Sequence, residues 1–108
     1  MPARDRPPNA SSIQVAPGIL RRVVVEGERM MICEFILDRG AVIPLHSHPH
    51  EQVGYVASGK IRVTMRGQET EVGPGEGYSA PANVEHGAVA LEASCVIDTF
   101  CPPREEYR

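Results

Sequence analysis

Short runs of apolar and β-branched residues, separated at close intervals by glycine and proline, constrain the fold of this chain more than any other feature. The 108 residues include ten glycines and ten prolines, which are spread along the chain and not clustered. Glycine and proline favour tight turns, and most of the runs between them are shorter than a typical helix. The pattern predicts about eight to ten evenly spaced strands, and hence an all-β fold that is either a small antiparallel barrel or a jelly roll.

Residues 60–66 have the clearest strand pattern. Apolar side chains alternate there with Arg and Thr side chains, as expected for a strand with one buried face. The run 52–57 precedes it by a two-residue Ser-Gly link, so we expect the two runs to pair as a hairpin. We expect a further tight turn at Gly67–Gln68.

Residues 29–37 are long enough for a helix, but turn residues flank them on both sides, and we interpret them as a strand. The charged tail after Pro102–Pro103 has the composition of a single helical turn. The remaining expected strands cover 13–15, 19–25, 42–48, 69–72, 77–80, 86–91 and 94–101.

The composition indicates a soluble globular protein. Hydrophobic residues make up 42% and charged residues 23%, and no apolar run approaches the length of a membrane span. A net charge of −3 without a basic stripe argues against nucleic acid as a partner. Residues 1–12 are polar and contain three prolines, so we expect a flexible N-terminal arm or an edge segment, followed by a single domain over residues 13–108.

The cysteines, Cys33, Cys95 and Cys101, form no C-x-x-C pair. Their odd number, and the lack of a signal-peptide pattern in residues 1–12, predict reduced thiols and a cytoplasmic location. We interpret the three side chains as buried small hydrophobic groups and not as reactive sites.

Three of the four histidines lie in the stretch G-A-V-I-P-L-H-S-H-P-H-E-Q, residues 40–52. His46 and His48 are two residues apart, so on a strand they would point to the same side. Gln52 opens the next apolar run, and His86 follows a glycine- and proline-rich turn much later in the chain. Imidazole binds several divalent transition metals, and we therefore predict one metal ion held by His46, His48, Gln52 and His86. These donors do not choose among Zn, Ni, Fe and Mn.

Gln52 would be a neutral ligand, and three imidazoles with one carbonyl leave the charge of a divalent ion uncancelled. Such an ion is a stronger Lewis acid toward an anionic substrate. Alternatively, Gln52 hydrogen-bonds a ligand without binding the metal itself. Two neighbours are weaker candidates: we assign His50 to the connecting loop, and the parity of Glu51 points its side chain away from the metal face.

A second candidate group lies in the last strand and the turn after it. Asp98 and Phe100 share a face of this strand with apolar neighbours, and burial would raise the pKa of Asp98 toward the range useful for proton transfer. Arg104 follows the Pro-Pro turn, and its guanidinium suits a carboxylate or phosphate. We therefore predict that Asp98 and Arg104 are catalytic and that Phe100 and Arg104 bind substrate. The alternatives are a structural Asp98–Arg104 ion pair and a Phe100 ring that only packs in the core.

The spacing of these residues resembles the two motifs of the cupin family. In the first motif, G-x5-H-x-H-x3,4-E-x6-G, the matching positions are Gly40, His46, His48, position 52 and Gly59. In the second, G-x5-P-x-G-x2-H-x3-N, they are Gly75, Pro81 and His86. The chain departs from the motifs at Gln52, Asn83 and Ala90, and Asn tolerates the left-handed backbone that the motif glycine supplies. The resemblance implies a single RmlC-like cupin β-barrel of jelly-roll type.

Within the cupins, the stretches H-S-H-P-H-E-Q-V-G-Y-V and D-x-F-x-P-P-R-E-E-Y resemble the KdgF subgroup of pectin-degradation proteins. That resemblance implies an enzyme of carbohydrate metabolism that converts unsaturated uronates to the linear keto form. It also implies a homodimer, a metal on three histidines and one glutamine, and a pocket formed by the Asp, Phe and Arg near the C-terminus. These roles carry over to His46, His48, Gln52, His86, Asp98, Phe100 and Arg104.

Three hypotheses for the function follow. The first is a metal-dependent enzyme of lyase or isomerase type that opens the ring of a small anionic sugar. The second is an Fe(II)-dependent dioxygenase, because a neutral ligand set with open positions can also bind oxygen. The third is a module that binds a sugar or another metabolite without catalysis.

Overall fold

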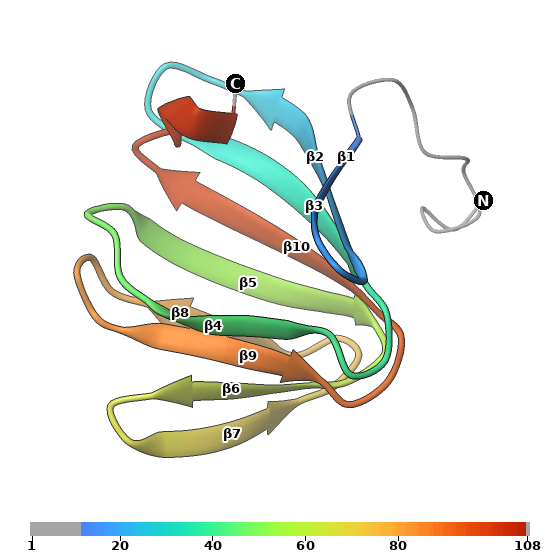
Figure 1. Ribbon diagram of the computed structural model, residues 1–108. Helices are drawn as coiled ribbons and strands as arrows, with labels where there is room; N and C mark the ends of the chain where they lie inside the picture. The colour runs from blue at the N-terminus through green and yellow to red at the C-terminus, as the bar shows by residue number, and fades with distance from the viewer. Residues whose placement is uncertain (1–11, 108) are drawn as a thin grey trace.

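Two antiparallel β-sheets face each other in the computed structural model, which describes residues 12–107 (Figure 1). The larger sheet has the strand order β1-β2-β3-β10-β5-β8, and the smaller has the order β4-β9-β6-β7. This arrangement confirms the all-β, jelly-roll prediction. The elements are β1 (Ile13–Ala16), β2 (Ile19–Glu26), β3 (Met31–Leu37), β4 (Val42–His46), β5 (Glu51–Ser58), β6 (Ile61–Met65), β7 (Gln68–Val72), β8 (Gly77–Ala80), β9 (His86–Ala90), β10 (Ser94–Cys101) and the 3₁₀-helix η2 (Glu105–Tyr107).

The predicted hairpin between residues 52–57 and 60–66 is wrong. β5 lies in the six-stranded sheet and β6 in the four-stranded sheet, so the chain changes sheets between them. Gly59 makes this corner with a φ of 85°, and a Cβ at that position would overlap Ala93 and Ser94, where β10 begins. The crossing brings the apolar faces of β5 and β6 toward the same core, which a hairpin within one sheet would not do.

Several strand limits also differ from the prediction by one or two residues, and three of these differences have a local reason. β3 begins at Met31 because the Gly27 N–H donates to the Met30 carbonyl at 2.8 Å and closes a turn first. β4 ends at His46, where the chain leaves one sheet to cross to the other. The turn between β6 and β7 is Arg66–Gly67, and both residues have positive φ, as the tight hairpin turns with the twist of a sheet require.

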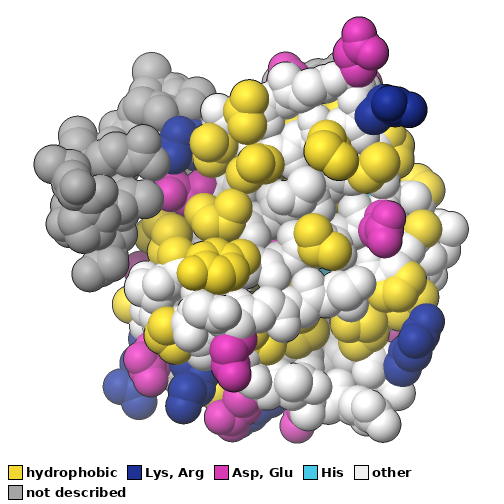
Figure 2. Space-filling view, turned by 180° about the vertical axis from the view of Figure 1, so that it is seen from behind, with side chains coloured by type: hydrophobic (Ala, Val, Ile, Leu, Met, Phe, Trp, Pro, Cys, Tyr) yellow, Lys and Arg dark blue, Asp and Glu magenta, His cyan; other side chains and the backbone are white. Residues whose placement is uncertain are grey.

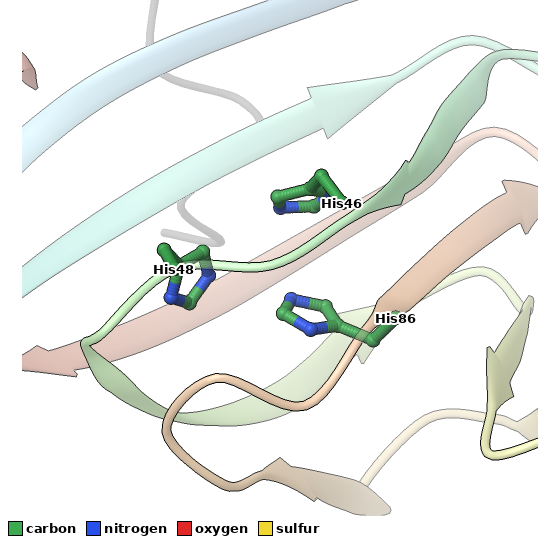
Figure 3. Close-up of side chains that lie close together, drawn as sticks. All are labelled: His46, His48 and His86. Carbon is green, nitrogen blue, oxygen red and sulfur yellow. The ribbon is translucent and has the colours of Figure 1, made fainter.

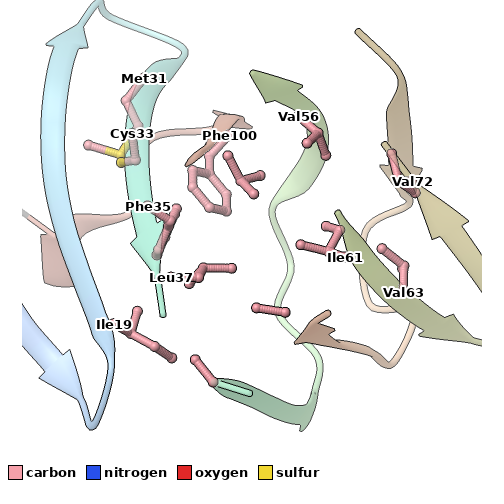
Figure 4. Close-up of a cluster of buried hydrophobic side chains, with 13 residues drawn as sticks. Ile19, Met31, Cys33, Phe35, Leu37, Val56, Ile61, Val63, Val72 and Phe100 are labelled. Carbon is pink, nitrogen blue, oxygen red and sulfur yellow. The ribbon is translucent and has the colours of Figure 1, made fainter. Parts of the chain in front are cut away.

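The hydrophobic core fills the space between the two sheets (Figure 4). Alternate residues of β3 point inward, as the two-residue period of a strand requires, and meet apolar residues from both sheets. Burying one such aliphatic or aromatic side chain stabilises a fold by roughly 1.5–3 kcal/mol. This core therefore holds the sheets at a defined separation. The buried members are Ile19, Met31, Cys33, Phe35, Leu37, Ala41, Val56, Ile61, Val63, Val72, Ala90, Val96 and Phe100.

Apolar side chains also lie on the outer surface (Figure 2). Val53 and Tyr55 are about half-exposed because they occupy the outward positions of β5, whose inward positions are buried. No disulfide joins Cys33, Cys95 and Cys101, all of which lie within the described residues. Among residues 12–107, no helix is both long and apolar enough to cross a membrane.

The predicted arm, residues 1–12, lies outside the described residues except for its last member. The single domain over residues 13–108, the homodimer and the cytoplasmic location stay predictions.

Candidate metal centre

Three histidines converge where the two sheets meet (Figure 3). His46 ends β4 and His86 begins β9, and the two are direct partners across this strand pair. His48 lies beyond the end of β4, in the segment that crosses to β5, so the expectation that it shares a strand face with His46 is wrong. The crossing segment nevertheless turns His48 toward the pair. One ring nitrogen from each of the three histidines lies within 4.8 Å of the other two.

The three imidazoles are held in one tautomer by the backbone. Each ring uses its Nδ1–H to donate to a carbonyl oxygen two residues away, and this leaves Nε2 as the unprotonated nitrogen. Burial lowers the pKa of His48 and of His86, which favours the neutral form that binds metals. His86 Nε2 is buried and has no hydrogen-bond partner among the described residues. The three acceptors are the carbonyl oxygens of Pro44, His50 and Val84, each at 2.9 Å.

Gln52 provides a fourth donor from the opposite sheet. Its side chain occupies the first buried position of β5, and its Oε1 lies 3.1 Å from His48 Nε2. His48 already donates through Nδ1, so both of these atoms present lone pairs to each other. Two such atoms at this distance repel unless a cation lies beside them. The orphaned His86 nitrogen and this facing pair therefore suit a divalent metal ion.

A turn between β8 and β9 fixes the position of His48. Asn83 has a φ of 66°, which confirms that it takes the left-handed backbone usually supplied by glycine. From there its backbone N–H donates to the His48 carbonyl at 2.8 Å. The departure from the second cupin motif at this position is thus compatible with the site.

The two weaker candidates lie outside the group of converging ring nitrogens. His50 contributes its carbonyl oxygen to His48, and its own ring is not part of the group. Glu51 is exposed on the outward side of β5, as its parity predicts.

Asp98 lies on the inner face of β10 and is 5% exposed. Burial raises the pKa of Asp98 from 3.8 to about 6, and the hydrogen bonds that it accepts oppose this shift. The direction is the one that the sequence predicts. The alternative of an Asp98–Arg104 ion pair is wrong, because Tyr78 Oη donates to Asp98 Oδ1 at 2.6 Å and Arg104 pairs with Glu106.

Sequence reasoning missed Tyr78. Its hydroxyl also accepts from Gln52 Nε2 at 3.0 Å, so it links the candidate metal ligand to Asp98. Tyr78 and Asp98 lie on the strands that flank β5, and both are opposite Gly54. A Cβ on Gly54 would overlap the Tyr78 ring and Asp98 Oδ1. The inward glycine in an otherwise regular strand was the one signal in the sequence that a side chain from a neighbouring strand fills this position.

A cavity of about 240 Å³ opens beside these residues, between the two sheets. Its lining combines donors from the candidate metal site with apolar and cationic side chains. The polar and aromatic lining residues are Arg21, Phe35, His46, Gln52, Tyr78, His86, Asp98, Phe100, Arg104 and Tyr107. This volume is close to the lower end of the range for small-molecule sites.

Two arginines line this cavity in different ways. The Arg104 guanidinium donates to Glu106 Oε2 at 2.7 Å, and its Cζ lies 4.5 Å from the Tyr107 ring centroid and 5.5 Å from that of Phe100. Arg21, which the sequence did not single out, also stacks on Tyr107: its Cζ is 3.8 Å from the centroid of that ring. Within residues 12–107, no carboxylate lies at ion-pair distance from Arg21.

The fold and the site together indicate a cupin-type protein: a two-sheet antiparallel sandwich with three histidines that could hold a metal ion. Comparison with known families agrees with this fold class. The Cupin domain model matches residues 33–97. The pectin degradation protein KdgF of Dickeya dadantii is 33% identical over 96 residues, 87% of each chain. The chain therefore belongs to the cupin family and, within it, is a homologue of KdgF.

Solved structures agree with this assignment. KdgF from Halomonas sp. is 40% identical, covers 90% of both chains and superposes with a TM-score of 0.87. An RmlC-like cupin from Shewanella frigidimarina is 31% identical, with a TM-score of 0.86 over 90% of this chain and 87% of the other. Salicylate 1,2-dioxygenase from Pseudoaminobacter salicylatoxidans shares the fold alone, at 19% identity and a TM-score of 0.77 over 81% of this chain and 26% of the other.

Proposed function

We propose that this cupin is a metal-dependent enzyme that converts an unsaturated uronate to its linear keto form. The observation that carries the proposal is the buried Asp98, which shares one cavity with His46, His86 and two arginines. A proton-transfer group, metal ligands and cations are the parts that ring opening of an anionic sugar requires. The homologue from Dickeya dadantii, which is named as a pectin degradation protein, supports a sugar acid as the substrate.

The metal would be held by His46, His48, Gln52 and His86. When bound, a divalent ion supplies a Lewis acid that polarises a sugar oxygen. All four donors are neutral, so they leave the positive charge of the site available to an anionic substrate. Zn, Ni, Fe and Mn are all compatible with these donors.

The proposed reaction moves protons and leaves the composition of the sugar unchanged. The anomeric hydroxyl loses its proton, the bond from C1 to the ring oxygen breaks, and an aldehyde forms at C1. The ring oxygen takes up a proton and becomes the hydroxyl of an enol at C5. Protonation of C4, with loss of the enol hydroxyl proton, then gives a ketone at C5. Asp98 can take up and return a proton at neutral pH, because burial raises its pKa to about 6. No oxidant is consumed.

The substrate carboxylate would bind at the arginine end of the cavity. Arg104 already pairs with Glu106, whereas Arg21 offers a guanidinium that faces no carboxylate among the described residues. Because both guanidinium groups line this end of the cavity, we assign the carboxylate to both, with Arg21 as the one whose charge is not already paired. Phe100, which is 1% exposed, would form the apolar floor beneath the sugar.

A direct test is to mix the purified protein with unsaturated galacturonate and to record the loss of the conjugated-alkene absorbance together with oxygen uptake. We expect the absorbance to fall well above the buffer rate without any oxygen uptake. Oxygen uptake that depends on substrate and Fe(II) would instead indicate a dioxygenase. Binding without any product would indicate a non-catalytic module.

Elemental analysis tests the metal centre separately. The wild-type protein should carry close to one transition-metal ion per chain, and His48→Ala should lose most of it. His50→Ala is the matched control, because this histidine lies in the same segment, outside the converging group, and its backbone carbonyl would remain. Equal metal content in all three proteins would contradict the ligand assignment.

A further inference from the structure

The hydroxyl group of Tyr78 connects the two halves of the candidate site. It donates to Asp98 Oδ1 at 2.6 Å and accepts from Gln52 Nε2 at 3.0 Å. The Gln52 amide in turn presents Oε1 to His48 Nε2 at 3.1 Å. A continuous line of hydrogen-bonding groups therefore runs from the buried carboxylate to the metal ligands, through a tyrosine with no assigned role.

The direction of this line follows from the number of protons available. A carboxylate only accepts hydrogen bonds, so the one hydroxyl proton of Tyr78 goes to Asp98. The Tyr78 oxygen is then left as an acceptor on its other side, and only the NH₂ end of the Gln52 amide can satisfy it. The carbonyl end of that amide must face the histidines, which is the orientation that a metal requires.

We propose that Tyr78 is a positioning residue that, with Asp98 as its acceptor, sets the Gln52 carbonyl oxygen toward the metal. The inference rests on the proposed metal centre. It adds a residue that would not bind the metal itself but would orient one of its ligands. Asp98 accordingly has a second task besides proton transfer: it keeps the Tyr78 proton away from Gln52. Asp98 itself lies outside the group of converging histidine nitrogens and hydrogen-bonds both Tyr78 and Gln52, so in this proposal it acts on the metal through these two side chains.

The packing of three adjacent strands supports a specific role for this contact. Tyr78, Gly54 and Asp98 form one row across β8, β5 and β10, and the glycine in the middle leaves the space that the Tyr78 ring fills. In the next row, Ala80 and Phe100 flank Gln52. Ala80 is small and Gly54 has no side chain, so the Tyr78 hydroxyl can reach both Gln52 and Asp98.

The test is the affinity of the metal-free protein for Zn²⁺, measured by competition with a chromophoric chelator. Tyr78→Phe keeps the ring and removes the hydroxyl, and we expect it to weaken binding about tenfold, the lower end of what losing such an outer partner causes. Tyr55→Phe is the matched control: it makes the same change on the outward side of β5 and should leave the affinity unchanged. In a Gln52→Ala background, Tyr78→Phe should cause no further loss, because the residue through which it acts is absent.

A second pair of variants separates positioning from general damage to the fold. Asp98→Asn keeps an oxygen that accepts from Tyr78 and should bind Zn²⁺ like the wild type. Asp98→Leu removes the acceptor, lets the hydroxyl donate toward Gln52, and should weaken binding about as much as Tyr78→Phe. These comparisons remain usable even if Tyr78→Phe folds poorly, which the unfolding temperature of each metal-free protein will show.

The outcomes distinguish the inference from the proposal beneath it. Wild-type affinity in Tyr78→Phe, or an equal loss in the Gln52→Ala background, would overturn the positioning role and leave the metal centre intact. Equal affinities of Asp98→Asn and Asp98→Leu would also overturn it. A wild-type protein that binds no Zn²⁺, Ni²⁺, Fe²⁺ or Mn²⁺ would remove the metal centre itself, and the inference with it.

Discussion

The two faces of the six-stranded sheet treat buried charge in opposite ways. On the outer face, Glu34 of β3 is 7% exposed and lies directly opposite Arg22 of β2, whose guanidinium donates to it at 3.1 and 3.2 Å. On the inner face, Asp98 is similarly buried, at 5% exposed. Within residues 12–107 its hydroxyl donor is Tyr78, and no lysine or arginine lies at ion-pair distance from it.

The two adjacent arginines of β2 repeat this difference. Arg22 points outward to Glu34, whereas Arg21 points inward to the cavity and stacks on Tyr107. The outer charges neutralise each other, so they contribute to the fold and offer nothing to a ligand. On the inner face, Asp98 is buried and Arg21 is half-buried, and neither has an ion-pair partner among residues 12–107. Burying a charge in this way costs stability, and such groups cluster at functional sites. The two faces therefore differ in that one buried carboxylate has a cationic partner and the other accepts from a hydroxyl group.

The largest expected difference between the two buried carboxylates is in the turnover of unsaturated galacturonate, when each carboxylate is replaced by its amide. Asp98→Asn removes the proton-transfer group and should lower kcat by about 10²–10⁴-fold. Glu34→Gln should leave kcat within about twofold of wild type, because the side chain faces away from the cavity. Steady-state kinetics on the metal-loaded proteins will decide, and comparable losses in both variants would remove the distinction between the faces.

In the metal-free protein, the pH dependence of the free energy of unfolding should also distinguish Asp98 from Glu34. The pKa of Asp98 is raised from 3.8 to about 6 in the folded state, so the folded state retains a proton that the unfolded chain releases. The contribution of Asp98 to wild-type stability should therefore fall as the pH rises from about 4 to about 6, while the lowered pKa values of His48 and His86 act in the opposite direction. Asp98→Asn lacks this loss and should be more stable above pH 6 by up to roughly 3 kcal/mol. Urea unfolding at several pH values is the measurement, and parallel curves for the two proteins would show the prediction to be wrong.

The outer ion pair should show the reverse behaviour in the same unfolding measurements. Glu34→Gln leaves the Arg22 guanidinium, which is largely buried, without its charged partner and should destabilise the fold by about 1–3 kcal/mol. The loss should persist at pH 7 and be independent of added metal, because this pair lies on the face of the sheet opposite the histidines. If Glu34→Gln instead became more stable, as Asp98→Asn should, then the burial of both carboxylates would destabilise the fold and the two faces would not differ.

The smallest expected effect concerns the two arginines. Arg21→Gln should raise KM for the uronate about tenfold, because it removes a charged hydrogen-bond donor from the cavity, while kcat changes little. Arg22→Gln makes the same change one position along β2 and should leave KM unaltered. If KM responds equally to both, Arg21 acts through the fold and not through the substrate.

Local pattern was enough to predict much of this protein. The positions of the strands follow from turn residues and from the alternation of apolar side chains, and both are properties of a few neighbouring residues. His46, His48, Gln52 and His86 were found from spacing, and Asp98 from its position between apolar residues on a strand. Each of these predictions needed only residues close in sequence or a motif of defined spacing.

The largest error in the predicted fold is the choice of strand partners. Residues 52–57 and 60–66 were paired because they are neighbours in the chain, but the core is formed by folding them into opposite sheets. The alternative of an Asp98–Arg104 ion pair rested likewise on closeness in the chain, while the structure pairs Arg104 with Glu106. The alternation of apolar and polar residues shows which side chains share a face of a strand. It does not show which other strand pairs with that strand.

The sequence by itself determined the kinds of side chain that could meet in this site and the strands that carry them. Only the tertiary structure decided that Tyr78 reaches Asp98 across Gly54 and that Arg21 joins Arg104 at the cavity. The physical reason is that such contacts depend on the order of strands in a sheet. That order is set by long-range burial of the whole core, and no short stretch of residues encodes it.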